Sequence, residues 1–129
     1  MEKTTQLSVA MENVPGQLGR LCRVLAQANV NIRGISVSDA ADISTIRVLV
    51  SNPAEAKRAL REAGLSFVTQ EVLVVELEDK PGALEDVAIR LGEAGVNVNY
   101  VYGSGDGGGG KGIMVLGVSD VDQARQALR

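Results

Sequence analysis

Few side chains in this sequence are suited to acid–base or nucleophilic chemistry. Its 129 residues include no His and a single Cys, Cys22. Without His, the chain lacks the commonest general base and metal ligand, and it cannot build a Ser–His or Cys–His nucleophile. A lone Cys also excludes structural zinc, iron–sulfur clusters and internal disulfides. We therefore predict that the protein is not an enzyme and that it uses no metal and no cofactor.

Carboxylates are the remaining candidates for acid–base work, and Glu76, Glu78 and Asp79 lie close together. Glu76 and Glu78 alternate with apolar residues, which is typical of the solvated side of a strand. Cys22 falls on the apolar stripe of a helical pattern, and we interpret it as a small buried hydrophobe. These residues therefore give little support to catalysis.

The most informative pattern is an Asn-Val-Pro-Gly turn that leads into an amphipathic helix. Pro at the first helical position favours a helix start, and Gly16 removes side-chain bulk there. The first backbone N–H groups of a helix are unpaired and carry the positive end of its dipole, so they suit a carboxylate. Asn13 can add an amide, and Asn31 enters the next strand. The alternative is that Pro-Gly only starts the helix and that the Asn residues cap turns.

The same turn occurs a second time, as Pro81-Gly82, and the flanking apolar residues recur at nearly the same offset. Asp79 takes the place that Asn13 has in the first turn. A carboxylate at this position would attract an ammonium group, whereas Asn is neutral. A free amino acid carries both a carboxylate and an ammonium group, so we predict it as the ligand of these turns.

Two copies of one module explain this recurrence, and we place them at residues 1–70 and 71–129. Each copy shows strand, helix, strand, strand, helix, strand, with alternating apolar residues in strands and helical spacing in helices. A hairpin loop is expected at Asp39–Asp42. Such βαββαβ units form an antiparallel sheet with both helices on one face. The predicted fold class is therefore α+β, with two ferredoxin-like modules in tandem.

The second copy lacks its last strand, because the chain stops at Arg129 after a short helix over Asp120–Leu128. The edge of its sheet then stays open, is completed by a partner, or reflects a shortened chain. A module of this size buries only about 60% of its unfolded surface. We therefore expect the modules, or two chains, to associate, and we predict a homodimer with four modules.

A glycine tract over Gly103–Gly112 resembles two phosphate-binding motifs, GxGxxG and the P-loop. Both motifs lead from a strand into a helix, whose first amides hold phosphate. Here the next segment, Ile113–Val118, is predicted to be a strand. We therefore interpret the tract as the hairpin loop of the second copy, with a mobile cover over a nearby site as the alternative.

Composition and charge exclude other kinds of partner. The net charge is −3, and aromatic residues are 2% of the chain, which disfavours nucleic acid. No apolar run reaches the roughly 18 residues of a membrane span, and the first residues lack an apolar signal segment. We expect a cytoplasmic protein without a nucleic-acid or membrane partner.

Residues 13–18, followed by residues 28–32, resemble the signature of the ACT domain, and residues 79–84 with 94–98 are a second match. The first copy is similar to the serine-sensing ACT domain of phosphoglycerate dehydrogenase, which implies effector contacts for Asn13 and Asn31. The second copy is closer to aspartokinase regulatory domains, with Asp79 before the Pro-Gly turn. The resemblance implies a tandem ACT protein that is non-catalytic and regulatory, and that binds its effector amino acid at the interface between modules.

Since the turn of one ACT module faces the strand start of its neighbour, the resemblance implies two composite sites: Asn13 with Asn97, and Asp79 with Asn31. The alternative function is a regulatory or interaction subunit of an amino-acid biosynthetic enzyme, similar to the small subunit of acetolactate synthase, without a ligand of its own. The predicted ligand-binding residues are Asn13, Val14, Pro15, Gly16, Gln17, Leu18, Asn31 and Ile32 of the first copy, and Asp79, Lys80, Pro81, Gly82, Ala83, Leu84, Asn97 and Val98 of the second.

Overall fold

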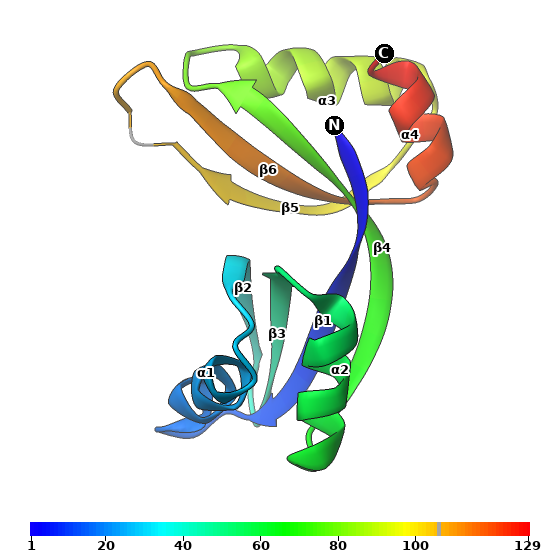
Figure 1. Ribbon diagram of the computed structural model, residues 1–129. Helices are drawn as coiled ribbons and strands as arrows, with labels where there is room; N and C mark the ends of the chain where they lie inside the picture. The colour runs from blue at the N-terminus through cyan, green and yellow to red at the C-terminus, as the bar shows by residue number, and fades with distance from the viewer. Residues whose placement is uncertain (106) are drawn as a thin grey trace. The chain divides into compact units, whose positions relative to one another are not determined.

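The computed structural model of the chain describes residues 1–105 and 107–129, which form six antiparallel strands and four helices (Figure 1). The elements, in chain order, are β1 (Glu2–Glu12), α1 (Gln17–Gln27), β2 (Ile32–Ala40), β3 (Ile43–Val50), α2 (Pro53–Glu62), β4 (Ser66–Glu78), α3 (Ala83–Glu93), β5 (Val98–Ser104), β6 (Lys111–Val118) and α4 (Val121–Ala127). The predicted α+β class with two ferredoxin-like modules is confirmed.

Two compact units make up the chain. The first unit is Thr5–Gln70, and the second unit is Met1–Thr4 together with Glu71–Arg129. Strands β1 and β4 each contribute residues to both units.

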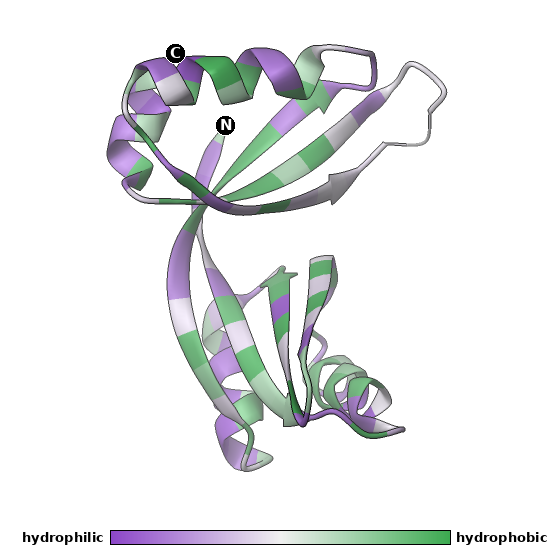
Figure 2. Ribbon diagram, turned by 180° about the vertical axis from the view of Figure 1, so that it is seen from behind, coloured by the Kyte–Doolittle hydropathy of each residue, from purple (hydrophilic) through white to green (hydrophobic). Residues whose placement is uncertain are grey.

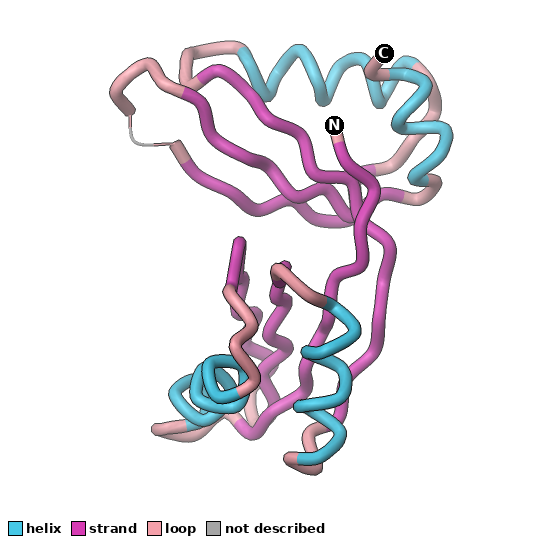
Figure 3. Tube along the Cα trace, viewed as in Figure 1, coloured by secondary structure: helices cyan, strands magenta, loops and turns pink. Residues whose placement is uncertain are grey.

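In the first unit the strand order is β2-β3-β1-β4, and α1 and α2 cover one face of the sheet (Figures 1 and 3). Apolar and polar residues alternate along the strands (Figure 2), as a sheet with one covered face requires. The β2–β3 hairpin is tighter than predicted. Asp39 and Ala40 pair with Ser44 and Ile43, so only Ala41-Asp42 form the loop. Ala41 adopts a left-handed conformation there, at a φ of 62°.

The core of the first unit lies between that sheet and its two helices. Its buried members come from β1, α1, β3, α2 and the connections after the two helices: Leu7, Val9, Met11, Leu21, Leu25, Val30, Ile46, Val48, Val50, Ala56, Leu60 and Leu65. Residues predicted on the α1 stripe divide into two groups, because Leu21 and Leu25 are buried whereas Leu18 is 47% exposed at the start of the helix. Cys22, predicted to be buried, is half-buried.

The second unit has the strand order β4-β6-β5, and the first residues of β1 flank β4 on its other side. In the first unit, β4 is the last strand and lies beside β1. In the second unit, Met1–Thr4 hold the equivalent position beside β4. The Lys3 ammonium supports this arrangement, because it lies 3.5 Å from the Glu71 carboxylate and 3.2 Å from that of Asp122. The strand missing from the second copy is thus replaced by the start of the same chain, which none of the three expected outcomes had included.

Helices α3 and α4 cover one face of this second sheet (Figure 1). The buried core between these helices and the sheet consists of Leu73, Val75, Val87, Leu91, Val96, Leu116 and Ala124. In the described residues, no helix is both long and apolar enough to cross a membrane.

Candidate functional site

The first Pro-Gly turn has a backbone that leaves the start of α1 uncapped. Gly16 adopts a left-handed conformation, with a φ of 92°, and no side chain of the described residues caps the helix. The first helical hydrogen bond runs from the Arg20 N–H to the Gly16 carbonyl, at 3.0 Å. The N–H groups of residues 17–19 therefore precede the helical ladder, as the sequence predicts.

Asn13 has a structural role that the sequence did not reveal. Its side-chain Nδ2 donates to Asp39 Oδ1 at 3.1 Å and to the Ala41 carbonyl at 2.9 Å. Its backbone N–H donates to the Asp42 carbonyl at 2.8 Å. Asn13 thus holds the β2–β3 hairpin against the turn that starts α1.

The second turn repeats this backbone. Gly82 has a φ of 88°, and the Asp86 N–H donates to its carbonyl at 3.0 Å. The Asp79 N–H donates to the Gly110 carbonyl at 2.7 Å, which matches the bond from Asn13 to the first hairpin. The two turns are therefore equivalent in structure as well as in sequence.

The side-chain contact of the second turn has the opposite polarity. Asp79 Oδ2 accepts a hydrogen bond from the Gly107 N–H, so the acceptor is now on the turn and the donor on the hairpin. Gly105 lies so close that a Cβ there would be 2.5 Å from the Asp79 carboxyl carbon. The exchange of Asn for Asp is thus matched by a hairpin that offers backbone N–H groups in place of acceptors.

The glycine tract joins two strands, as predicted, but it is longer than the loop: Gly103 and Ser104 belong to β5, and Lys111 and Gly112 belong to β6. It leads from β5 into β6, and Asp106 of the tract lies outside the described residues. The tract leads into the strand β6 in place of a helix, so the geometry of the two phosphate-binding motifs is not formed.

A cavity of about 80 Å³ opens beside the Asp79 carboxylate. It lies between the end of β4, the first turn of α3 and the β5–β6 hairpin. Its lining residues are Leu77, Glu78, Asp79, Lys80, Ala83, Leu84, Ser104, Gly105, Gly112 and Met114. Four predicted site residues of the second copy therefore border one cavity.

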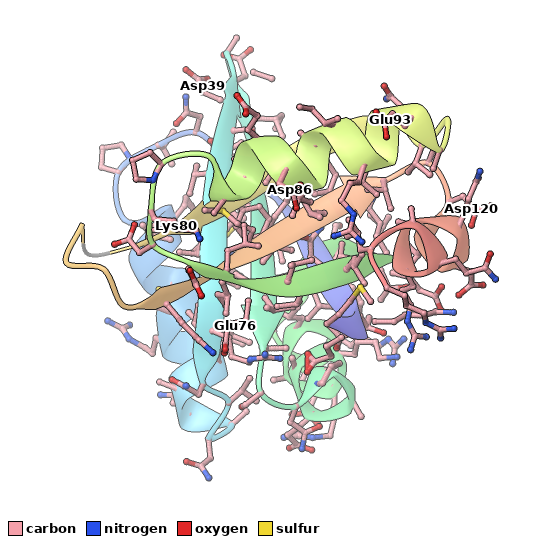
Figure 4. All side chains as sticks on the ribbon, turned by 90° about the horizontal axis from the view of Figure 1, so that it is seen from above. Asp39, Glu76, Lys80, Asp86, Glu93 and Asp120 are labelled. Carbon is pink, nitrogen blue, oxygen red and sulfur yellow. The ribbon has the colours of Figure 1, made fainter. Side chains whose placement is uncertain are left out.

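Two acidic side chains near this cavity are paired with lysines. Lys80 Nζ lies 3.0 Å from Glu78 Oε2, and Lys111 Nζ lies 3.3 Å from Glu76 Oε1. The hydrogen bond and the charge of Lys80 hold the pKa of Glu78 below its ordinary value. Figure 4 shows Lys80 on the segment that joins β4 to α3, with Glu76 on β4. Glu76 and Glu78 are both exposed, as predicted for the solvated side of the strand.

Asn31 and Asn97 occupy matching places at the entry to β2 and β5. The Asn31 N–H donates to Ser51 Oγ at 2.9 Å, and the Ser51 N–H donates back to the Asn31 carbonyl at 2.9 Å. Asn97 makes the same pair of bonds with Ser119, at 3.0 and 2.9 Å. The side chain of Asn97 also donates to Asn99 Oδ1 at 2.8 Å.

The remaining predicted residues differ in exposure. Val14 and Leu18 are each 47% exposed, and Leu84 is 38% exposed. Ile32 and Val98 instead pack against the cores of their units, so these two side chains have a structural role. Within residues 1–105 and 107–129, no group of three or more His, Cys, Asp or Glu side chains is placed to hold a metal ion.

The fold and the turns define a class of protein: paired modules, each with an uncapped helix start after a Pro-Gly turn. The family model for the ACT domain pair matches residues 2–128, so the chain belongs to the ACT domain pair family. No curated protein matches the sequence.

Solved structures share this fold over nearly the whole chain. Protein BT0572 from Bacteroides thetaiotaomicron is 28% identical, with a TM-score of 0.91 over 98% of this chain and 86% of that one. The regulatory subunit of aspartate kinase from Thermus thermophilus, in its ligand-free form, is 14% identical, with a TM-score of 0.75 over 99% of this chain and 89% of that one. The corresponding subunit from Thermus flavus is 15% identical, with a TM-score of 0.67 over 100% and 94%.

Proposed function

We propose that this protein is a non-catalytic regulatory protein that binds a free amino acid at its Pro-Gly turns. The observation that carries this proposal is the cavity beside Asp79, which lies next to the uncapped start of α3. The N–H groups of Leu84 and Glu85 precede the first helical bond of α3 and suit the ligand carboxylate. Asp79 offers its carboxylate to the ligand ammonium, in competition with the Gly107 N–H.

Membership of the ACT domain pair family supports the regulatory role, and so does the shared fold with aspartate kinase regulatory subunits. Following the resemblance, we propose that each complete site joins a turn to the strand start of another module. Asn13 then acts with Asn97, and Asp79 acts with Asn31.

We also propose that the protein is a homodimer. Strand β2 is the outer strand of its sheet in the described part of the chain, and its residues Ile35 and Val37 are 40% and 52% exposed. An outer strand with exposed apolar residues is a surface that proteins commonly cover with a partner strand. Mass measurement on a size-exclusion column tests this proposal, and a monomer at all concentrations contradicts it.

A second candidate function rests on the same exposed strand. The protein could serve as an interaction subunit that docks on an amino-acid biosynthetic enzyme through a sheet edge, without a ligand of its own. Co-purification with such an enzyme, without any effect of free amino acids, would favour this function over the first.

The deciding experiment is calorimetric titration with the twenty amino acids, together with thermal unfolding. A bound amino acid raises the melting temperature, because it stabilises only the folded state. Gly16→Val, Gly82→Val and Asp79→Ala should weaken binding. Gly64→Val is the matched control, since Gly64 is also left-handed, at a φ of 73°, but lies after α2 and away from both turns. Absence of binding at millimolar concentration, or full binding by all three turn variants, overturns the proposal.

A further inference from the structure

The cavity beside Asp79 restricts the kind of side chain that a ligand can carry. Its inner walls are apolar: Leu77 comes from β4, Met114 from β6, and Ala83 and Leu84 from the first turn of α3. An apolar wall favours an uncharged side chain, because a charge placed against it has no partner.

The hairpin side of the cavity is formed by backbone. Gly105 and Gly112 line it, and both are closely packed: a Cβ at Gly112 would lie 2.3 Å from the Ser104 carbonyl oxygen. A Cβ at Gly105 would strike the Asp79 carboxylate. This wall is therefore smooth and already in contact with its neighbours, so it presents no charged group to a ligand side chain.

Apart from Asp79, which the ligand ammonium takes in this proposal, the acidic groups near the cavity are already paired with lysines. Glu78 is paired with Lys80, and Glu76 with Lys111. A charged ligand side chain would have to break one of these pairs or remain without a partner in an apolar pocket. The lack of a partner against an apolar wall lowers its affinity relative to an uncharged side chain, and the loss of an exposed ion pair adds a smaller cost.

Size gives the third restriction. The cavity measures about 80 Å³ and is partly open to solvent, and since a cavity of roughly 150 Å³ holds a benzene ring, its enclosed part takes about three or four non-hydrogen atoms. Asp79 itself lines the cavity, so the ligand ammonium and Cα occupy part of that space. What remains suits a side chain of no more than a few atoms.

We propose that the site of the second unit is selective for amino acids with a small, uncharged side chain: alanine, serine, threonine or valine. This inference rests on the proposed function, and it adds the class of ligand. It also assigns Ala83 and Met114 as the residues that set the size limit, from the helix side and the sheet side respectively.

Methionine methyl NMR reports on this cavity directly. The chain has three Met residues, of which Met114 lines the cavity and Met11 is buried in the core of the first unit, so Met11 is an internal reference. Titration with the four small amino acids should shift the Met114 methyl signal and leave that of Met11 in place. Leucine, phenylalanine, lysine and glutamate should bind about ten-fold or more weakly, as size limits in apolar pockets allow.

Two variants test the size limit itself. Ala83→Leu fills the cavity and should raise the ratio of the valine Kd to the alanine Kd about ten-fold. Met114→Ala enlarges it and should improve the affinity for leucine relative to alanine by a similar factor, read by calorimetry. Ile89→Ala is the matched control, because Ile89 lies on the same helix and is 52% exposed.

The outcomes separate the two proposals. Binding of lysine or phenylalanine as tight as that of alanine, with the same shift at Met114, overturns the selectivity and leaves the proposed function standing. Binding that leaves the Met114 signal unmoved also overturns it. Absence of binding by every amino acid overturns both. If Ala83→Leu does not fold, the comparison of ligands on the wild-type protein still decides.

Discussion

Gly16 and Gly82 share a left-handed backbone at the start of their helices, at φ values of 92° and 88°. A Cβ at either position would meet no atom of the described residues within 4 Å. The requirement for glycine therefore comes from backbone conformation and not from crowding. Open space above the glycine is also what a ligand carboxylate needs in order to reach the helix N–H groups.

Gly82→Ala should lower the free energy of unfolding by about 1–2 kcal/mol, the cost of a left-handed conformation for a residue with a Cβ. Gly92→Ala is the control within the same helix. Gly92 also has nothing within 4 Å of an added Cβ, but its φ is not positive, so Ala should stabilise by up to about 1 kcal/mol. Urea unfolding measures both values. If both substitutions changed the free energy of unfolding by the same amount, backbone conformation would not be the cause.

The Glu78–Lys80 pair should be visible in a pH titration. The pKa of Glu78 is lowered by Lys80, first through the hydrogen bond and then through charge. A lowered carboxyl pKa stabilises the folded state above the pKa of the unfolded chain, and this contribution is lost as the pH falls through the folded pKa. In Lys80→Met the NMR titration midpoint of Glu78 should rise towards its ordinary value, whereas Lys57→Met, on α2, should leave it unchanged. An unmoved midpoint in Lys80→Met contradicts the pairing.

Individual residues also show where sequence reasoning reaches its limit. Pro-Gly before an apolar stripe predicts the turn, because proline and glycine fix local backbone geometry. The contacts of Asn13 and Asp79 with their hairpins depend on residues far along the chain, and no local pattern reports them. The one available signal was the pairing of residue types between turn and hairpin. Asp39 can accept from Asn13 in the first copy, and a glycine backbone N–H can donate to Asp79 in the second.

At the scale of elements, helix starts were more predictable than hairpins. Asn52 accepts from the Glu55 N–H at 3.2 Å, with Pro53 at the first helical position, and Asp120 accepts from the Gln123 N–H at 3.0 Å. Both caps follow from local sequence. The β2–β3 loop was predicted too long. Asp39 and Ala40 lack the apolar alternation of a strand, yet their backbones pair with β3.

Removal of these caps should have unequal effects on the two helices. Asn52→Ala and Asp120→Ala should each lower the free energy of unfolding by about 1 kcal/mol. Helix α4 has seven residues, of which only Ala124 is buried, whereas α2 has ten residues with three buried, so α4 should depend more on its cap. Amide exchange should therefore rise across all of α4 in Asp120→Ala, but only in the first turn of α2 in Asn52→Ala. Gln126→Ala, on α4, should leave exchange near the wild-type level. Similar exchange profiles in the two helices would contradict this difference in support.

At the scale of the whole molecule, the duplication was readable from the sequence and the exchange of strands was not. Repeated spacing shows that two modules exist, because it compares like segments with like. It cannot show that Met1–Thr4 leave the first unit and flank β4 in the second. These residues continue the extended pattern of β1, and only Lys3, placed against Glu71 and Asp122, marks the change.

A protein that lacks residues 1–4 should therefore lose stability mainly in the second unit, although the deleted residues precede the first. Without them the part of β4 that they flank in the second unit is unpaired on that edge, so amide exchange should accelerate there and stay unchanged in β3 of the first unit. Lys3→Met should show a weaker form of the same effect. Asp122 and then Glu71 raise the pKa of Lys3, so its contribution is present below the unfolded pKa and is lost as the pH rises through the folded one. If exchange accelerated in β3, or did not accelerate in β4, the start of β1 would support only the first unit.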